Sequence, residues 1–113
     1  MNLLFTNAGR RTYLVEFALA LRKGGYPLKI FVSDTSKYTA SFWVSRQVRY
    51  FLTPRVGEDE NIYAKILLDN CLKRHIDVVI PLMDFELPVL AREKELFRDK
   101  NIKVIICSNA LKN

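Results

Sequence analysis

The sequence predicts a three-layer α/β fold with a mainly parallel, five-stranded sheet. Short runs of β-branched and aliphatic residues alternate with segments of helical periodicity, and this alternation is typical of repeated βαβ units. The chain has 113 residues, half of them hydrophobic, which is enough for one core of its own. We therefore expect a single domain over residues 1–113.

Five segments have the composition of strands. They are residues 2–6, 28–33, 47–52, 77–80 and 103–107. The fourth segment is almost continuously apolar, which predicts a central parallel strand buried on both faces. Thr53-Pro54 and Pro81 are expected to end the third and fourth strands, because proline disfavours continuation. Strands that alternate with helices in this order predict a doubly wound, Rossmann-like sheet.

The helices between these strands follow from apolar spacing and from their end signals. An inward stripe is expected at Leu14, Phe17, Ala18 and Leu21, and Gly24-Gly25 should stop that helix. A second helix should begin at the acidic residues 58–60 and end at the basic residues 73–75. Its predicted inward stripe is Tyr63, Ile66, Leu67 and Cys71.

Two further segments complete the predicted arrangement. Residues 85–98 should form one helix, in which Pro88 is tolerated only within the first turn. Residues 38–45 predict a short helix or an irregular segment.

Polar residues follow the strands, and in parallel α/β sheets ligands bind beyond the carboxyl ends of the strands. The candidate substrate-binding residues are Gly9, Arg10, Arg11, Asp34, Arg55, Asp84 and Glu86. The first strand runs directly into Asn7 and then into Gly9, Arg10 and Arg11, just before a helix. The free N–H groups of a helix amino terminus favour anions, so this turn is a candidate anion site.

Each candidate also has a purely structural interpretation. Gly9 either allows close backbone approach to an anion or simply makes a tight turn. Arg10 and Arg11 oppose the helix dipole unless an anion compensates them, or they pair with Asp34 or Asp84 across the sheet edge. Similarly, Asp84 and Glu86 either contact a ligand or another domain, or they serve as a helix cap and a first-turn residue.

Several functional classes are disfavoured by what the sequence lacks. There is one glycine where a dinucleotide fingerprint needs three, and no P-loop lysine motif. Cys71 and Cys107 show no zinc-ligand spacing, so no metal site is expected. No apolar run is long enough to span a membrane and no signal peptide is recognisable, so we expect a cytoplasmic protein.

The net charge of +6 is concentrated in residues 1–55, where nine Lys or Arg face two acidic residues. This asymmetry suggests an acidic ligand or partner, although a solvated basic face explains it as well. A nucleotide- or nucleic-acid-binding module is the alternative function, but the basic and aromatic residues fit packing more simply than nucleic-acid binding. A homodimer that buries Phe42 and Trp43 is a further hypothesis.

Two segments of the sequence resemble the amino-terminal domain of ATP-grasp proteins. They are residues 4–16, with the sequence LFTNAGRRTYLVE, and residues 80–87, with the sequence IPLMDFEL. Asp34 and Pro54-Arg55 extend the resemblance over almost the whole chain. The most similar members are stand-alone relatives of the large subunit of carbamoyl-phosphate synthase.

The resemblance implies a longer ligase, in which a carboxylate is activated with ATP and Mg²⁺ and an amine then attacks. In this family ATP and Mg²⁺ lie between later lobes, and the amino-terminal domain flanks the acceptor substrate. The chain ends at Asn113, about where such proteins continue towards the ATP-grasp lobes. We therefore expect a pre-ATP-grasp domain that binds an anionic small molecule, partners a downstream ATP-grasp domain and does not catalyse ligation alone.

Overall fold

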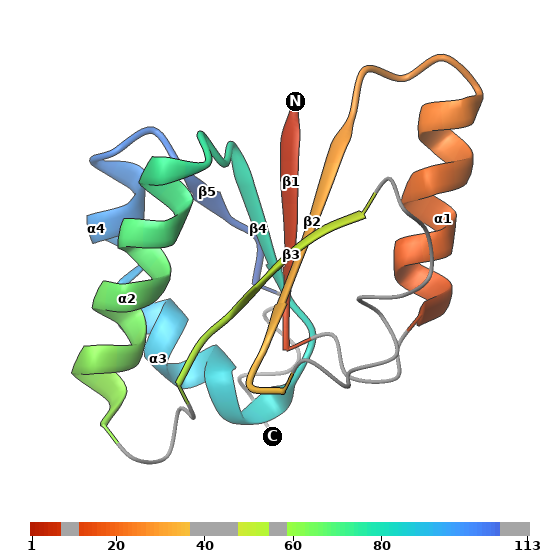
Figure 1. Cartoon of the computed structure of the whole chain (residues 1–113). Helices are drawn as coiled ribbons and strands as arrows, with labels where there is room; N and C mark the ends of the chain where they lie inside the picture. The colour runs from red at the N-terminus through yellow and green to blue at the C-terminus, as the bar shows by residue number, and fades with distance from the viewer. Residues whose placement is uncertain (8–11, 37–47, 55–58, 107–113) are drawn as a thin grey trace.

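Five parallel strands form one sheet in the order β3-β2-β1-β4-β5. The computed structural model describes residues 1–7, 12–36, 48–54 and 59–106. The strands are β1 (Asn2–Thr6), β2 (Lys29–Asp34), β3 (Val48–Leu52), β4 (Val78–Pro81) and β5 (Lys103–Val104). The sheet thus confirms the predicted fold class, and all its strands point the same way (Figure 1).

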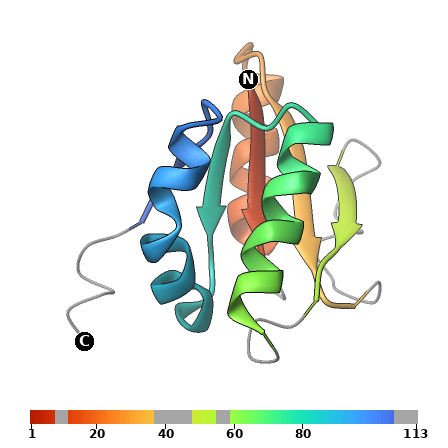
Figure 2. The same cartoon turned by 90° about the vertical axis from the view of Figure 1, so that its left-hand side faces the viewer.

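Helices cover both faces of the sheet. They are α1 (Thr12–Lys23), α2 (Glu60–Lys73), the 3₁₀ turn η2 (Asp84–Glu86), α3 (Leu87–Arg92) and α4 (Lys94–Arg98). Figure 1 shows α1 on one side of the sheet and α2, α3 and α4 on the other, and in Figure 2 the latter group lies in front of the strands. The predicted segment 38–45 lies outside the described residues, as do Phe42 and Trp43.

The core has one part on each side of the sheet. On the α2 side, Tyr63, Leu67 and Cys71 are buried as predicted, while Ile66 is only half-buried. On the α1 side the inward stripe is centred on Val15 and Ala18, and Phe17 is exposed, contrary to the prediction. The predicted stripe was wrong at Phe17 because spacing alone cannot distinguish the centre of an apolar face from its edge.

Strand β4 lies inside the sheet, between β1 and β5. Its burial is complete only on the α2 side, where Val79 is inaccessible to solvent, whereas Val78 and Ile80 on the other side are half-buried. The prediction of full burial on both faces was therefore too strong. The α1 layer extends across β1 and β2 but covers β4 less completely.

The predicted helix over 85–98 was wrong in its continuity. The chain instead makes η2, α3 and α4, with Glu93 outside helical geometry between the last two. The 3₁₀ turn η2 at the start of this segment directs Glu86 into the protein. One regular helix from residue 85 would not include this turn. Pro88 lies in the first turn of α3, as predicted. Strand β5 is also shorter than predicted, since it ends at Val104.

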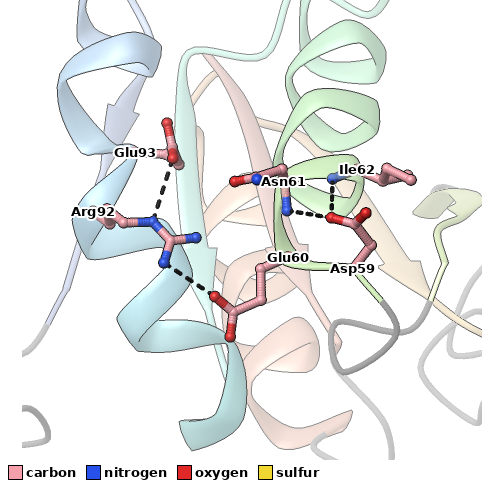
Figure 3. Close-up of polar contacts among 6 residues, drawn as sticks. All are labelled: Asp59, Glu60, Asn61, Ile62, Arg92 and Glu93. Atoms are coloured by element: carbon pink, nitrogen blue, oxygen red, sulfur yellow. Dashed lines mark hydrogen bonds and ion pairs between the residues drawn. The ribbon is translucent and has the colours of Figure 1, made fainter.

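The amino terminus of α2 is fixed by side chains of its own acidic segment. Asp59 is the N-cap, and its Oδ1 accepts hydrogen bonds from the N–H groups of Asn61 at 3.0 Å and Ile62 at 3.2 Å. Glu60 forms an ion pair of 3.1 Å with Arg92, which links α2 to the end of α3 (Figure 3). The predicted acidic start and basic end of this helix are confirmed.

The strand order reverses direction between β1 and β4. From β1 the chain builds outwards through β2 and β3, and it then crosses to the other side of β1 to form β4 and β5. In open parallel sheets, the crevice beyond the carboxyl ends of the strands at such a reversal is the usual ligand site. The residues that follow β1 and β4 are therefore the first place to look for function.

Candidate functional site

Three neighbouring strands end in polar residues at the carboxyl edge of the sheet. Asn7 follows β1, Asp34 ends β2, and Asp84 lies three residues after the end of β4. Because β2, β1 and β4 are adjacent in the sheet, these positions share one edge and flank the reversal of strand order. This group forms the described part of the candidate site.

Asp34 is half-buried and helps to shape the chain after β2. Its Oδ1 accepts a hydrogen bond of 2.6 Å from the N–H of Thr35, and its backbone carbonyl accepts one of 2.9 Å from the N–H of Thr53. The second bond ties the ends of β2 and β3 together. Asp34 thus has a clear structural role at the edge, in addition to any contact with a ligand.

Asp84 is exposed at the start of η2. The N-cap position of this turn is occupied by Met83, and the side chain that bonds to the Met83 N–H is Glu86, not Asp84. The structural interpretation of Asp84 as a helix N-cap is therefore wrong. Asp84 is thus an exposed carboxylate at the carboxyl edge of the sheet.

Glu86 lies two residues further on but is completely buried. Its Oε1 accepts hydrogen bonds from the hydroxyls of Thr6 and of Tyr63, the latter at 3.0 Å, and its Oε2 accepts one of 3.3 Å from the N–H of Met83. The donors come from β1, α2 and the residue before η2. Glu86 therefore connects three elements beneath the candidate site.

The same network reaches the end of β1. The Nδ2 of Asn7 donates a hydrogen bond of 3.0 Å to the Tyr63 hydroxyl, and Asn7 is buried with a positive φ of 48°. Asparagine tolerates this left-handed conformation better than most residues do. The buried network of Thr6, Asn7, Tyr63 and Glu86 thus fixes the point at which the chain leaves β1.

Burial controls the protonation of this network. Loss of solvent raises the pKa of Glu86, although the hydrogen bonds from Thr6, Asn7, Tyr63 and the Met83 N–H oppose that rise. Burial and the neighbouring Glu86 also raise the pKa of Tyr63, so its hydroxyl stays protonated and can donate. A neutral tyrosine beside a carboxyl group with a raised pKa keeps the net charge of the network low.

We predict that Glu86→Gln removes a pH dependence of stability. Because the folded pKa of Glu86 is raised above its ordinary value of 4.5, the unfolded chain loses this proton first as the pH rises. The stability contribution is therefore fully present below about pH 4.5 and is lost as the pH rises through the folded pKa. Urea unfolding between about pH 4 and pH 8 should show a smaller fall for the variant than for the wild type. Equal pH slopes for the two proteins would contradict the raised pKa.

Two other hydroxyls lie buried near the same edge. Among the described residues, the Oγ of Ser33 and the Oγ1 of Thr53 have no hydrogen-bond partner. Ser33 is the register neighbour of Thr6, and Thr53 directly follows β3. Because an unpaired buried hydroxyl costs about 1–3 kcal/mol, we expect water or a ligand group to complete them.

The remaining predicted site residues are Gly9, Arg10, Arg11 and Arg55, all of which lie outside the described residues. The structure adds Thr6 and Tyr63, which sequence reasoning had placed only in a strand and in an apolar stripe. The sequence did contain one signal for this network, namely a tyrosine, Tyr63, in a predicted buried stripe. The hydroxyl of a buried tyrosine usually needs a polar partner.

The described segments offer neither a cluster of metal ligands nor a helix that could span a membrane. No group of three His, Cys, Asp or Glu side chains in them could hold a metal ion. No helix in these segments is long and apolar enough to cross a membrane.

The parallel sheet, with its reversal of strand order between β1 and β4, defines a Rossmann-like class of α/β domain. Within that class, the chain belongs to the PylC-like N-terminal domain family, whose model matches residues 3–105. This is the pre-ATP-grasp domain of ATP-grasp enzymes, so the resemblance to an ATP-grasp amino-terminal domain is confirmed. The finer resemblance to the carbamoyl-phosphate synthase large subunit stays a prediction.

Solved structures show the same fold at low sequence identity. Glycinamide-RNase-transformylase T from Mycobacterium tuberculosis is 10% identical with a TM-score of 0.63, and the match covers 92% of this chain and 28% of that one. dTDP-glucose 4,6-dehydratase from Bacillus anthracis, solved in complex with NAD, is 16% identical with a TM-score of 0.61, and the match covers 92% and 36% of the two chains. The chain thus spans well under half the length of either protein. No curated protein sequence matches it.

Proposed function

We propose that this chain is the acceptor-substrate side of an ATP-dependent carboxylate–amine ligase, similar to stand-alone relatives of the carbamoyl-phosphate synthase large subunit. The observation that best supports this proposal is the position of Asn7 and Asp84 on either side of the reversal between β1 and β4. Family membership favours this function over a non-catalytic nucleotide- or nucleic-acid-binding module. The expected setting is the cytoplasm.

In this proposal the turn after Asn7 binds an anionic group of the acceptor substrate. Gly9 allows close backbone approach, and Arg10 and Arg11 supply the positive charge. Asp84 adds a carboxylate at the edge of the same crevice, where it can accept hydrogen bonds from an amine. Asp34 and Arg55 extend the site along the ends of the neighbouring strands.

The proposal gives Glu86 a supporting role. Its carboxyl group is buried and accepts hydrogen bonds from Thr6, Tyr63 and the Met83 N–H. In this proposal Glu86 therefore does not touch the substrate, and it acts by fixing the backbone around the site. By holding Tyr63, and through it Asn7, Glu86 fixes the residue from which the chain continues towards Gly9, Arg10 and Arg11. Preorganisation of this kind lowers the entropy lost on binding.

ATP and Mg²⁺ are assigned in this proposal to a downstream ATP-grasp domain. When bound there, MgATP would supply the activation of the carboxylate. The residues of this chain would bind and orient the acceptor substrate and would not catalyse ligation alone. Neither the carboxylate nor the amine is specified by these residues.

We expect Arg10→Ala and Arg11→Ala, introduced separately into the complete ligase, to raise the KM for the acceptor substrate by about 10- to 100-fold. A charge-assisted hydrogen bond is worth about 1.5–3 kcal/mol, which corresponds to that range. ADP release can be measured with a panel of carboxylates and amines to find the acceptor and then its KM. The matched control is Arg49→Ala, because Arg49 is an exposed arginine on β3. If both arginine variants keep the wild-type KM and kcat, the assignment of this turn is wrong.

A further inference from the structure

A cavity lies between α4 and the edge strand β5. It has a volume of about 450 Å³. Its lining residues are Lys94, Arg98, Asn101, Ile102, Lys103 and Val104. Lys103 begins β5, and its N–H donates to the carbonyl of Asp77 just before β4, so the cavity lies towards the amino ends of the strands. It is thus separate from the candidate site at the reversal of strand order between β1 and β4.

The cavity is surrounded by positive charge that has little compensation. Arg98 pairs with Glu95 at 3.6 Å, but both side chains are about three-quarters exposed, and such surface pairs are weak. None of the ion pairs in the described part of the chain involves Lys94 or Lys103. Three cationic groups therefore converge on one hollow, and a concave basic surface concentrates anions.

The outer edge of β5 lies on the same side, although Val104 itself is only 1% exposed. The N–H groups of Lys103 and Ile105 donate to the carbonyls of Asp77 at 3.0 Å and Val79 at 2.9 Å. Because successive residues of a strand direct their peptide groups to opposite sides, the N–H and carbonyl of Val104 point away from β4. Within the described segments no strand lies on that side of β5, and Val104 itself lines the cavity.

The size and shape of this surface favour a small molecule over an added peptide strand as its occupant. An added peptide strand would find only two residues of β5 to pair with, and a lysine on a short edge strand disfavours strand addition. The volume instead lies within the range of small-molecule sites. Ile102 and Val104 form the buried floor of the cavity, and the exposed residues of its lining are Lys94, Arg98, Asn101 and Lys103.

We propose that this cavity is a binding site for a small phosphorylated metabolite. Its phosphate group contacts Lys94, Arg98 and Lys103, and the body of the metabolite lies against Asn101 and the aliphatic parts of the two lysine side chains. Lysine and arginine are the usual side-chain partners of phosphate, the latter through its planar fork of donors. This site does not depend on the proposed ligase function, because it uses different residues at a different edge.

The test is a titration of the isotope-labelled 113-residue chain with inorganic phosphate, glucose 6-phosphate and glucose, followed by NMR. We expect saturable shifts of amide signals in residues 98–104 with both phosphate probes and no response to glucose. The double variant Lys94→Gln/Lys103→Gln should weaken binding by about tenfold, since each exposed ionic contact contributes up to about 1 kcal/mol.

The matched control is Lys65→Gln/Lys73→Gln, which removes the same charge from two exposed lysines of α2. Equal weakening by the two double variants would overturn the proposal, because it would indicate only a general effect of net charge. Shifts that never saturate, or that occur only at the carboxyl edge, would also overturn it. Tighter binding of an acidic peptide such as hexaglutamate to residues 98–104 would show that the site serves a protein partner instead.

Discussion

Replacement of Glu86 by alanine is expected to lower the free energy of unfolding by about 3–5 kcal/mol. The side chain is completely buried, so its removal leaves a cavity beneath the end of β1. It also leaves the hydroxyls of Thr6 and Tyr63 and the N–H of Met83 without their acceptor. A domain of this size has a total stability of about 5–15 kcal/mol, so the variant should be close to unfolding at 37 °C. Urea unfolding followed by far-UV circular dichroism measures the loss.

Two variants separate this effect from the simple loss of a carboxylate. Glu16→Ala removes an exposed glutamate from α1 and should change stability by less than about 0.5 kcal/mol. Glu86→Gln keeps the volume and one acceptor oxygen, so it should lose less stability than Glu86→Ala. A loss below about 1 kcal/mol for Glu86→Ala would mean that water replaces the carboxyl group easily. That result would contradict the supporting role proposed for the network.

The sheet could be predicted from the sequence because its signals are local. Each strand is a short β-branched run bounded by a turn residue, and β1 was predicted at its observed limits, Asn2–Thr6. The ends of α1 and α2 were also encoded locally. Gly25 adopts a positive φ of 108° just after α1, and Asp59 caps α2 through its own side chain.

The network beneath the candidate site could not be predicted in the same way. Glu86 and Thr6 are 80 positions apart in the sequence, and Tyr63 comes from a third element. In the sequence alone, Glu86 resembles any acidic residue in a first helical turn, where it would be exposed. Only the tertiary fold shows that η2 directs this side chain inwards, to donors that compensate part of its burial.

The positions of two candidate residues, although not their role, could be predicted from where the strands end. Asp34 and Asp84 do lie at the shared carboxyl edge, and both have exposed surface. Whether they contact a ligand depends on the substrate, which no local pattern specifies. The break at Glu93 was missed for a related reason, since the apolar spacing of Leu90 and Phe97 fits one continuous helix as well as two short ones.

Phe97→Ala is expected to have an effect as large as that of Glu86→Ala, but at the opposite end of the sheet. Phe97 is completely buried in the cluster that also contains Leu90, Ile102 and Val104. Its backbone carbonyl accepts the N–H of Ile102 at 3.0 Å, so the same residue fixes the turn into β5. Loss of a buried phenyl ring typically costs about 3–5 kcal/mol. Urea unfolding measures this loss, with Leu96→Ala, a half-exposed neighbour in α4, as the control.

Amide exchange along the chain can show whether Phe97→Ala destabilises only the α4–β5 edge or the whole domain. α4 has five residues and β5 has two, so this edge has few contacts of its own and depends on the Phe97 ring. In the variant, amide exchange should therefore accelerate more at Ile102 and Ile105 than at Val32 in β2. Phosphate binding at the α4–β5 cavity should weaken in parallel, because Ile102 and Val104 line it. Uniform acceleration along the whole chain would instead show that β5 unfolds only together with the rest of the sheet.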